Sequence, residues 1–311
     1  MTNPSTNSCP LVSVIMNCFN GEEYLKEAIE SVLNQTYKNW ELIFWDNQST
    51  DGSERILKSY NSNKLKYFYS SKHTPLYEAR NFALENAMGE FIAFLDVDDW
   101  WEQDKLEKQI PLFNDPEVGL VYGNFWIENQ KKGRKKIAFK MPLPRGNIQN
   151  DLLESYTVGI LTIVIRKQTL DTLPYIFDKR FNYIGDYDLV IRLASKCKID
   201  CVQEPVAHYR KTGTNLSVTK TDLNISEMQL WLKEALDKSD IVPISMHSRV
   251  SFSILRGQVN LMFQGKRIIE GLIILLASFL KFPRIFLLLF CRKFLGMVVD
   301  SCKSLLVKDL P

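Results

Sequence analysis

Three kinds of feature are missing from this sequence, and each absence excludes a class of protein. The six cysteines, at positions 9, 18, 197, 201, 291 and 302, show no CxxC spacing, so neither a disulfide framework nor a zinc site is indicated. The first ten residues, MTNPSTNSCP, lack the basic and apolar regions of a signal peptide. No internal repeat is found, which argues against a solenoid or propeller. We therefore expect the chain to remain in the reducing cytoplasm.

A strong charge imbalance is also absent. The net charge of +3 comes from 39 basic and 36 acidic residues, which argues against nucleic acid as the main partner. The one dense basic run, Lys131 to Lys136, predicts a solvated hairpin tip, with a contact to anionic lipid as the alternative.

The composition and the pattern of the first half predict a folded α/β protein. Hydrophobic residues make up 45% of the chain and charged residues 24%, as in globular domains. Short apolar runs alternate with amphipathic segments, which predicts a parallel sheet covered on both faces. The expected strands are 11–16, 41–45, 65–69 and 91–95, and the expected helices are 22–33, 53–59 and 77–88.

The second half has a different pattern, which predicts an antiparallel addition. A hairpin is expected from 119–127 and 136–141, followed by a strand at 160–165, an amphipathic segment at 185–196 and a strand at 199–210. The expected organisation is a disordered terminus at 1–9, one α/β domain at 10–220 and a helical region at 221–311.

The C-terminal region is predicted to be helical over 227–264 and is then dense in large apolar residues over 266–295. Its longest uncharged run, Gly271 to Leu280, is well short of the roughly 20 residues that a spanning helix needs. Apolar helices edged by Lys and Arg predict a surface-lying anchor on an anionic membrane. A helical cap packed on the main domain is the alternative.

Polar clusters follow the first, second and fourth expected strands, at 17–21, 46–51 and 96–99. Ligands of parallel α/β sheets bind at the carboxyl ends of the strands. Asp96 and Asp98 would project the same way from an extended chain. Their repulsion would be offset by a hard divalent cation, which keeps positions for phosphate oxygens. A surface cluster or a helix cap is the alternative.

Two further charged residues belong to this predicted edge. Asp46 stands where the second strand ends and could accept a hydrogen bond from a base N–H, such as that of uracil. A turn and a helix N-cap explain the residues after it. Arg80 opens a helix on the same rim, where a guanidinium can hold a diphosphate through two hydrogen bonds.

Three segments taken together resemble glycosyltransferase family 2. They are VSVIMNCFNGEEYLKEAIESVLNQTY, WELIFWDNQSTDGS and EARNFALENAMGEFIAFLDVDDWW. Their order and spacing match the family over about residues 11–127, and more loosely to about 217. The resemblance implies a GT-A fold, a Rossmann-like and mostly parallel sheet flanked by helices, here with a C-terminal helical extension.

The resemblance also implies a donor site for a nucleotide sugar and a divalent metal, Mn²⁺ or Mg²⁺. Position by position, Phe19 and Asn20 would flank the nucleotide, Asp46 would bind the base, Arg80 would face the diphosphate, Asp96 would bind ribose or metal, and Asp98 would bind the metal.

The general base implied by the resemblance is Asp186, with Asp188 as a structural or acceptor-side neighbour. Inverting transfer is a direct displacement, so one carboxylate must take the proton of the acceptor hydroxyl. The chain departs from the family pattern at Gly185, where many members have Glu, and at Asn17, which replaces a frequent Pro. A helix N-cap is the alternative role for Asp186.

Two further positions have weaker signals. His208, or Arg210 beside it, is a candidate phosphate or metal contact, although a lone His is more often structural. Trp100 could stack on a sugar on the acceptor side, and burial next to the site is the alternative.

The sequence thus predicts an inverting glycosyltransferase that moves a sugar, with UDP as the expected carrier, to a hydroxyl of a glycan or lipid-linked acceptor. The expected setting is cell-surface polysaccharide synthesis, with peripheral contact at the cytoplasmic face of the inner membrane. Homo-oligomerisation stays open, as do the sugar and the acceptor. One alternative is a nucleotidyltransferase, which would need a Gly-rich loop with Arg and Lys after the first strand; the segment NCFNGEEY is not such a loop. The other is a catalytically inactive glycan-binding scaffold.

Overall fold

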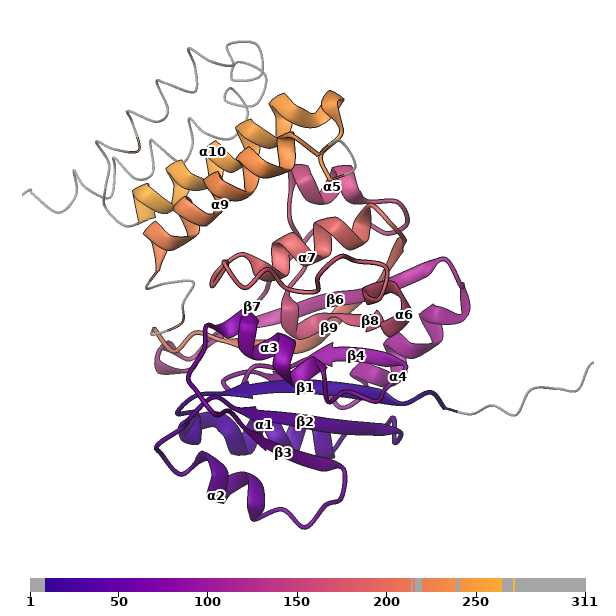
Figure 1. Ribbon diagram of the computed structural model, residues 1–311, viewed down its shortest axis with the longest axis vertical. Coiled ribbons are helices and arrows are strands. Elements are labelled where there is room, and N and C mark those ends of the chain that lie inside the picture. Colours follow the sequence, from indigo (N-terminus) through magenta and orange to yellow (C-terminus); the bar gives the residue numbers. More distant parts are fainter. Residues whose placement is uncertain (1–8, 214, 216–219, 239–240, 265–270, 272–311) are drawn as a thin grey trace, which may run out of the picture. The chain divides into compact units, whose positions relative to one another are not determined.

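The computed structural model describes residues 9–213, 215, 220–238, 241–264 and 271 (Figure 1). They fall into two compact units. The first comprises the described residues of Met1–Leu152 and Tyr156–Thr219, and the second those of Leu153–Ser155 and Lys220–Pro311. Every strand of the described chain lies in the first unit.

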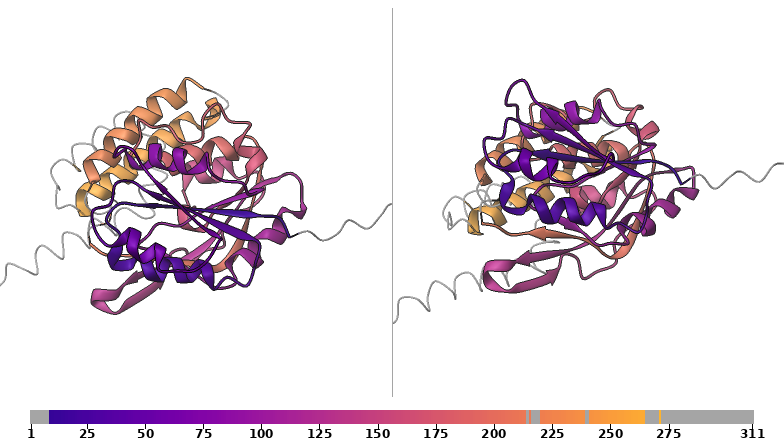
Figure 2. Two further views of the ribbon diagram at one scale, coloured as in Figure 1. Left: turned by 60° about the horizontal axis from the view of Figure 1, so that its bottom comes forward. Right: turned by 90° about the horizontal axis from the view of Figure 1, so that it is seen from below.

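Four parallel strands form one half of the sheet, as predicted. Their order is β3-β2-β1-β4, and their bounds are β1 Val12–Cys18, β2 Trp40–Asp46, β3 Leu65–Tyr69 and β4 Phe91–Phe94. Helices α1 (Glu22–Leu33), α2 (Ser53–Lys58) and α3 (Leu76–Leu84) connect them and lie on both faces of the sheet (Figure 2). All seven residues of β1 are buried, as expected for a strand that is covered on both faces.

Alternation along β1 divides its side chains between two layers, because successive residues of a strand face opposite ways. Val12, Val14 and Met16 belong to the main core together with Leu25 and Ile29 of α1. The intervening residues of β1 therefore face the layer that contains α3, the helix that carries Arg80.

The other half of the sheet is mixed in direction, so the sheet as a whole is not purely parallel. It contains β5 Trp100–Trp101, β6 Val118–Asn129, β7 Arg134–Ile137, β8 Val164–Arg166 and β9 Lys198–Arg210. The full order is β3-β2-β1-β4-β8-β6-β9-β5, with β7 added on β6. Strand β8 runs antiparallel to β4 and β6, and β6 runs parallel to β9.

Three expected boundaries are wrong. The second strand of the hairpin, expected at 136–141, is β7 at Arg134–Ile137, because the turn already closes at Gly133. The strand expected at 160–165 begins only at Val164, because the N–H and hydroxyl of Thr162 both bond to the carbonyl of Gly159 and close a 3-10 turn. Helix α3 ends at Leu84 rather than near Met88. There the side-chain amide of Asn86 donates to Phe82 O and competes with the helical pattern.

The strand directions bring six carboxyl ends to one edge of the sheet, because β3 is also parallel to β2. Strands β1, β2 and β4 are parallel, and β6 and β9 point the same way because β8 is antiparallel to both β4 and β6. The loops after Cys18, Asp46 and Phe94 therefore share this edge with the end of β9 at Arg210. The first unit also contains helix α7 (Gly185–Ala194) and the short helices α4 (Lys105–Gln109) and α6 (Lys167–Leu170), whereas α5 (Gln149–Glu154) has residues in both units.

The second unit is helical over its described part, as predicted for 227–264. It contains α9 (Thr221–Leu236) and α10 (His247–Gln264), whose buried side chains include Trp231 and Val250. Among the described residues, no helix is both long and apolar enough to cross a membrane. The apolar stretch 266–295 lies outside the described residues, apart from Gly271.

Candidate active site

The first two loops of this edge are held together by reciprocal hydrogen bonds. The N–H of Asn20 donates to Ser49 Oγ at 3.0 Å, and Asn20 Oδ1 accepts from the N–H of Thr50 at 2.8 Å. The N–H of Glu22 donates to Asp51 Oδ2 at 2.9 Å. Asn20 itself has φ 53°, a conformation that Asn adopts more easily than most residues. Its role in the structure is to fix the loop that presents Phe19.

Phe19 is exposed at the mouth of the edge. Its side chain is 53% exposed, and its ring lies 4.4 Å from that of His73 in the loop after β3. His73 is fixed in turn by Nδ1, which lies 3.0 Å from the carbonyl oxygen of Asn47. An exposed ring beside a fixed imidazole provides a surface on which a planar base can stack.

Asp46 lies deeper than a direct base contact requires. It is 1% exposed, Oδ1 accepts from the N–H of Ser49 at 2.7 Å, and Oδ2 accepts from the hydroxyl of Tyr67 at 3.0 Å. Both oxygens thus have partners within the chain. In this arrangement Asp46 shapes the second loop, and a contact with a base would use the remaining lone pairs.

Asn17 is a buried polar residue near the end of β1. It is 9% exposed, and among the described residues neither atom of its side-chain amide has a hydrogen-bond partner. By the alternation of β1 it faces the layer of α3 and Arg80. A buried amide without partners costs about 1–3 kcal/mol, so this group is suited to bind a polar ligand that enters the edge.

The diphosphate candidate Arg80 is buried and paired. It is 2% exposed, and Nη2 lies 2.5 Å from Asp96 Oδ1. The guanidinium also lies over the ring of Tyr77, 5.1 Å from its centroid. The side chain is therefore oriented before any ligand binds, with Asp96 on one side and Tyr77 on the other.

The remaining acidic residues after β4 are held by Arg210. Its N–H donates to Asp99 Oδ1 at 2.9 Å, and its Nε donates to the carbonyl of Asp98 at 2.8 Å. Nη2 forms an ion pair with Glu27 of α1. Arg210 thus joins the end of β9 to the loop after β4. Gly21 allows the first loop to approach the same place, because a Cβ there would lie 2.8 Å from Val97 Cγ2.

The electrostatics of this cluster favour a bound cation. Burial, together with the charge of Asp96, raises the pKa of the Asp98 carboxyl to about 6. Burial and the charges of Asp98 and Asp96 raise the pKa of Asp99 well above its usual value. Among the described residues no three His, Cys, Asp or Glu side chains form a ready-made metal cage. Two carboxylates, Asp96 and Asp98, nevertheless suit Mg²⁺ or Mn²⁺, which commonly take one or two carboxylates and complete their coordination with water and substrate phosphates.

The structure gives His208 two carboxylate partners. Nδ1 lies 2.6 Å from Glu128 Oε1 and Nε2 lies 2.8 Å from Glu102 Oε1. The ring stacks on Trp100, with centroids 4.5 Å apart and an interplanar angle of 13°. A metal or phosphate contact by His208 would require one nitrogen to exchange its partner. The guanidinium of Arg210 also lies over the Trp100 ring, 4.4 Å from the centroid of that ring.

The candidate base Asp186 meets α3 through Tyr77. The hydroxyl of Tyr77 donates to Asp186 Oδ1 at 2.9 Å and to the carbonyl of Tyr183 at 3.2 Å. Burial raises the pKa of the Asp186 carboxyl. Tyr77 therefore links the base candidate to Arg80 and, through it, to Asp96.

Gly185 is explained by the same contact. A Cβ at this position would lie 2.6 Å from two ring atoms of Tyr77, which is far inside van der Waals contact. The ring of Tyr77 thus occupies the space that a side chain at 185 would need.

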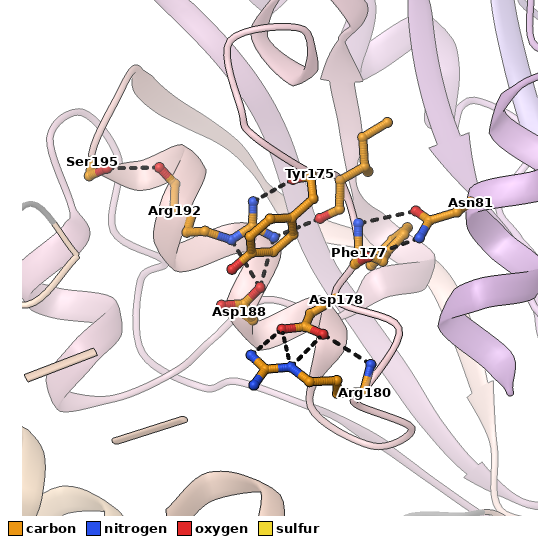
Figure 3. A network of polar contacts seen from close by, with 9 residues as sticks. Asn81, Tyr175, Phe177, Asp178, Arg180, Asp188, Arg192 and Ser195 are labelled. Carbon is orange, nitrogen blue, oxygen red and sulfur yellow. Dashed lines mark hydrogen bonds and ion pairs between the residues drawn. The ribbon is translucent and has the colours of Figure 1, made fainter. Parts of the chain in front are cut away.

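Asp188 is buried and paired with Arg192, so its role in the structure is to hold α7 in place. It is 3% exposed and accepts from Nε and Nη2 of Arg192 at 2.9 and 2.7 Å. Arg192 also donates to the carbonyls of Tyr175 and Ile176, so the pair fastens α7 to the segment before it (Figure 3). The same segment is held to α3, since Asn81 bonds both the N–H and the carbonyl of Phe177 (Figure 3).

Comparison with solved structures identifies the fold. The chain resembles the solved structure of S. aureus TarS 1-349 in complex with UDP-GlcNAc, with a TM-score of 0.64 and 20% identity over 81% of this chain and 72% of that one. It also resembles the mannosyltransferase PcManGT from Pyrobaculum calidifontis in complex with GDP-Man and Mn²⁺, with a TM-score of 0.61 and 17% identity over 88% and 76% of the two chains. These likenesses show the GT-A fold.

The family follows from sequence. The model of glycosyl transferase family 2 matches residues 13–171, about half of the chain. The UDP-Glc:alpha-D-GlcNAc-diphosphoundecaprenol beta-1,3-glucosyltransferase WfgD of Escherichia coli is 35% identical over 173 residues, which are 56% of this chain and 67% of that protein. The chain belongs to glycosyl transferase family 2 and is a glycosyltransferase.

Proposed function

We propose that this glycosyltransferase transfers a sugar from a UDP-sugar to a hydroxyl of a lipid-linked or growing glycan, with inversion at the anomeric carbon. The observation that carries the proposal is the chain of contacts from Asp96 through Arg80 and Tyr77 to Asp186. These contacts join Arg80, the proposed cation for a leaving diphosphate, to Asp186, the proposed carboxylate for an attacking hydroxyl. The UDP-linked donor and the lipid-linked acceptor named for WfgD support this choice of substrates.

The donor would lie along the edge formed by the first two loops. Phe19 and His73 would stack on the base, and Asn20 and Asp46 would keep the two loops in place around it. The side-chain amide of Asn17, which has no partner among the described residues, would form a hydrogen bond with the donor. Arg80 would bind the diphosphate and offset the charge that grows on it as the bond to the sugar breaks.

Asp98, with Asp96, would hold a Mn²⁺ or Mg²⁺ ion. Such an ion, when bound, would add positive charge next to the leaving diphosphate. The raised pKa of Asp98 fits this assignment, because its cause is crowding by burial and by Asp96. His208 lies against Trp100 behind this cluster and is proposed to orient that ring on the acceptor side rather than to bind the metal directly.

Asp186 would act as the general base. The acceptor hydroxyl attacks the anomeric carbon from the face opposite the diphosphate, and its proton passes to Asp186. The hydrogen bond from Tyr77 to Oδ1 would hold this carboxylate in one orientation. Asp188, fastened to Arg192, would keep α7 in place beneath it.

The neighbouring Tyr77 thereby becomes a positioning residue that the sequence did not indicate. It stands three residues before Arg80 in α3, and side chains with this spacing share one face of a helix. The spacing could have suggested the link, but its partner Asp186 is more than a hundred positions away.

Calorimetry and a donor-hydrolysis screen test this proposal. UDP should bind in the presence of Mn²⁺, and Asp98→Ala should weaken that binding. Asp186→Asn should retain UDP binding and lose transfer by about 100-fold to 10,000-fold. Absence of UDP binding would refute the donor site, and retained transfer by Asp186→Asn would remove Asp186 from its role. Asp171→Asn, an exposed helix-end carboxylate away from the site, is the matched control.

The location of the protein is also a proposal. Synthesis on a lipid-linked acceptor would place it peripherally at the cytoplasmic face of the inner membrane. The nucleotidyltransferase alternative is set aside by the family, and measured turnover would set aside the inactive scaffold.

A further inference from the structure

The hairpin formed by β6 and β7 concentrates positive charge. Residues 129–150 contain seven Lys and Arg residues and no Asp or Glu. The whole chain has a net charge of +3, so the rest of the chain is net negative by four charges. This asymmetry raises the question of whether the charges are neutralised within the fold.

One face of the hairpin is neutralised. Residues paired across two strands lie on the same face, and Lys135 pairs with Glu128. Lys135 Nζ lies 3.1 Å from Glu128 Oε1 and 4.5 Å from the centroid of the Trp126 ring. Glu128 also contacts His208. This face therefore belongs to the supporting structure of the candidate active site.

The opposite face is not neutralised. Arg134 and Lys136 alternate with Lys135 along β7, so their side chains face the other way. Both are exposed, as is Lys132 at the tip. Within the described part of the chain, none of the three forms an ion pair with a carboxylate. The turn itself is fixed, because Asn129 Oδ1 accepts from the N–H of Lys132 at 3.1 Å and Gly133 adopts φ 56°.

The hairpin emerges at the edge that carries the candidate active site. Strand β6 runs in the same direction as β4, and its last residues pair with the end of β9. Glu128 lies opposite Arg210, the residue that holds the loop after β4. Figure 2 shows the hairpin extending beyond the rest of the sheet in both views. A ligand or surface bound by the tip of the hairpin would therefore lie next to the candidate active site.

We infer that Lys132, Arg134 and Lys136 form a basic face that binds the phosphate groups of an anionic lipid surface and places the candidate active site against it. Alternate residues of a strand are about 7 Å apart, so the cations form a row instead of converging on one phosphate. A row of cations matches the headgroups of a bilayer. The choice of lipid over other polyanions rests on the lipid-linked acceptor of the proposed function.

Vesicle flotation of the full chain tests the inference. The parent protein should float with phosphatidylcholine vesicles that contain phosphatidylglycerol, and not with pure phosphatidylcholine. The variant K132E/R134E/K136E should lose affinity by on the order of 100-fold, since each cation near an anionic surface contributes about a tenfold factor or less and reversal adds repulsion. Lys135 is left unchanged because it supports Glu128.

The matched control is K26E/K179E/K196E, which changes the net charge by the same amount at exposed positions outside the hairpin. It should retain most of the binding. Equal loss in both variants, no loss in the hairpin variant, or no flotation of the parent with anionic vesicles would each overturn the inference. Displacement by inorganic phosphate beyond that caused by chloride at equal ionic strength would assign the face to soluble phosphate and would overturn the lipid assignment.

The same samples separate this inference from the proposed function. The hairpin variant should keep UDP binding and donor hydrolysis, because none of its three residues contacts the candidate active site. Vesicle binding without UDP binding would leave the basic face intact and refute the proposed donor site. Circular dichroism confirms that each variant is folded.

Discussion

The hydrogen bond from Tyr77 affects the pKa of Asp186, the proposed base. A donor to a carboxylate favours its ionised form and lowers its pKa, whereas burial raises it. Tyr77 supplies such a donor at 2.9 Å, against the burial that dominates the pKa of Asp186. The charge of Arg80 also opposes the rise that burial causes, so loss of the Tyr77 hydrogen bond should raise the pKa of Asp186 further.

Replacement of Tyr77 by Phe should therefore alter transfer through Asp186. The ring and its packing on Gly185 stay, while the pKa of Asp186 rises, so the acidic limb of the pH profile should move to higher pH. We expect kcat to fall by about 10-fold to 100-fold with little change in KM for the donor. Steady-state kinetics across pH measure both. Tyr37→Phe, which removes a tyrosine bond to the carbonyl of Pro10 outside the site, should leave the profile unchanged. A pH profile that does not move would contradict the positioning role.

Asn17 gives a second prediction at the scale of single residues. Asn17→Ala should weaken UDP-sugar binding by about 10-fold, because one or two hydrogen bonds to the ligand are lost. The unliganded protein should not lose stability by the same amount, since the amide has no partner there to lose. Calorimetry and thermal unfolding measure the two effects. Asn124→Ala is the contrasting variant: its amide is buried and fully bonded, so it should lower stability and spare donor binding.

At the scale of elements, α3 and the start of α7 act as one assembly. Asn81 bonds both backbone groups of Phe177, and Asn182 accepts from the N–H of Leu76. These bonds hold the helix that carries Arg80 against the segment that leads into α7, the helix that carries Asp186. A change at the contact between α3 and α7 should therefore displace both Arg80, the proposed diphosphate contact, and Asp186, the proposed base.

Gly185→Ala tests that contact. The added Cβ would lie 2.6 Å from the Tyr77 ring, and relief of such overpacking costs about 1–3 kcal/mol. We expect urea unfolding at lower denaturant and a loss of transfer beyond the loss of donor binding. Gly257→Ala, in α10 with no atom within 4 Å of the new Cβ, should instead stabilise its helix by up to about 1 kcal/mol. Equal stability of the parent and Gly185→Ala would show that α3 moves freely relative to α7.

The same contacts show what could be predicted from sequence. The strands β1 to β4 were predictable because each is a short apolar run bounded by polar loops, and the acidic residues after β4 because they follow such a run. The contact of Tyr77 with Asp186 and the bonds of Arg210 to Asp98 and Asp99 join positions more than a hundred residues apart, which periodicity does not report. Strand β8 was misplaced because the turn at Gly159 is set by a side chain, Thr162.

At the scale of the whole molecule, Asp98 links the charge of the site to the stability of the fold. The pKa of its carboxyl is about 6 in the folded state and about 4 in an unfolded chain. Between these values the folded state binds the proton more tightly. The contribution of Asp98 to the free energy of unfolding therefore falls as pH rises from about 4 to about 6 and is constant above that.

Asp98→Asn should accordingly be more stable than the parent at neutral pH in the absence of metal, by of order 1 kcal/mol. The difference should shrink toward zero near pH 4, where Asp98 is protonated in the folded protein. Urea unfolding at a series of pH values measures it, and Asp171→Asn, an exposed carboxylate at the end of α6, is the control. Mn²⁺ should stabilise the parent by mass action and leave Asp98→Asn unchanged. A stability difference that is the same at every pH would show that Asp98 is not crowded, and the electrostatic reason for a cation at this edge would then be lost.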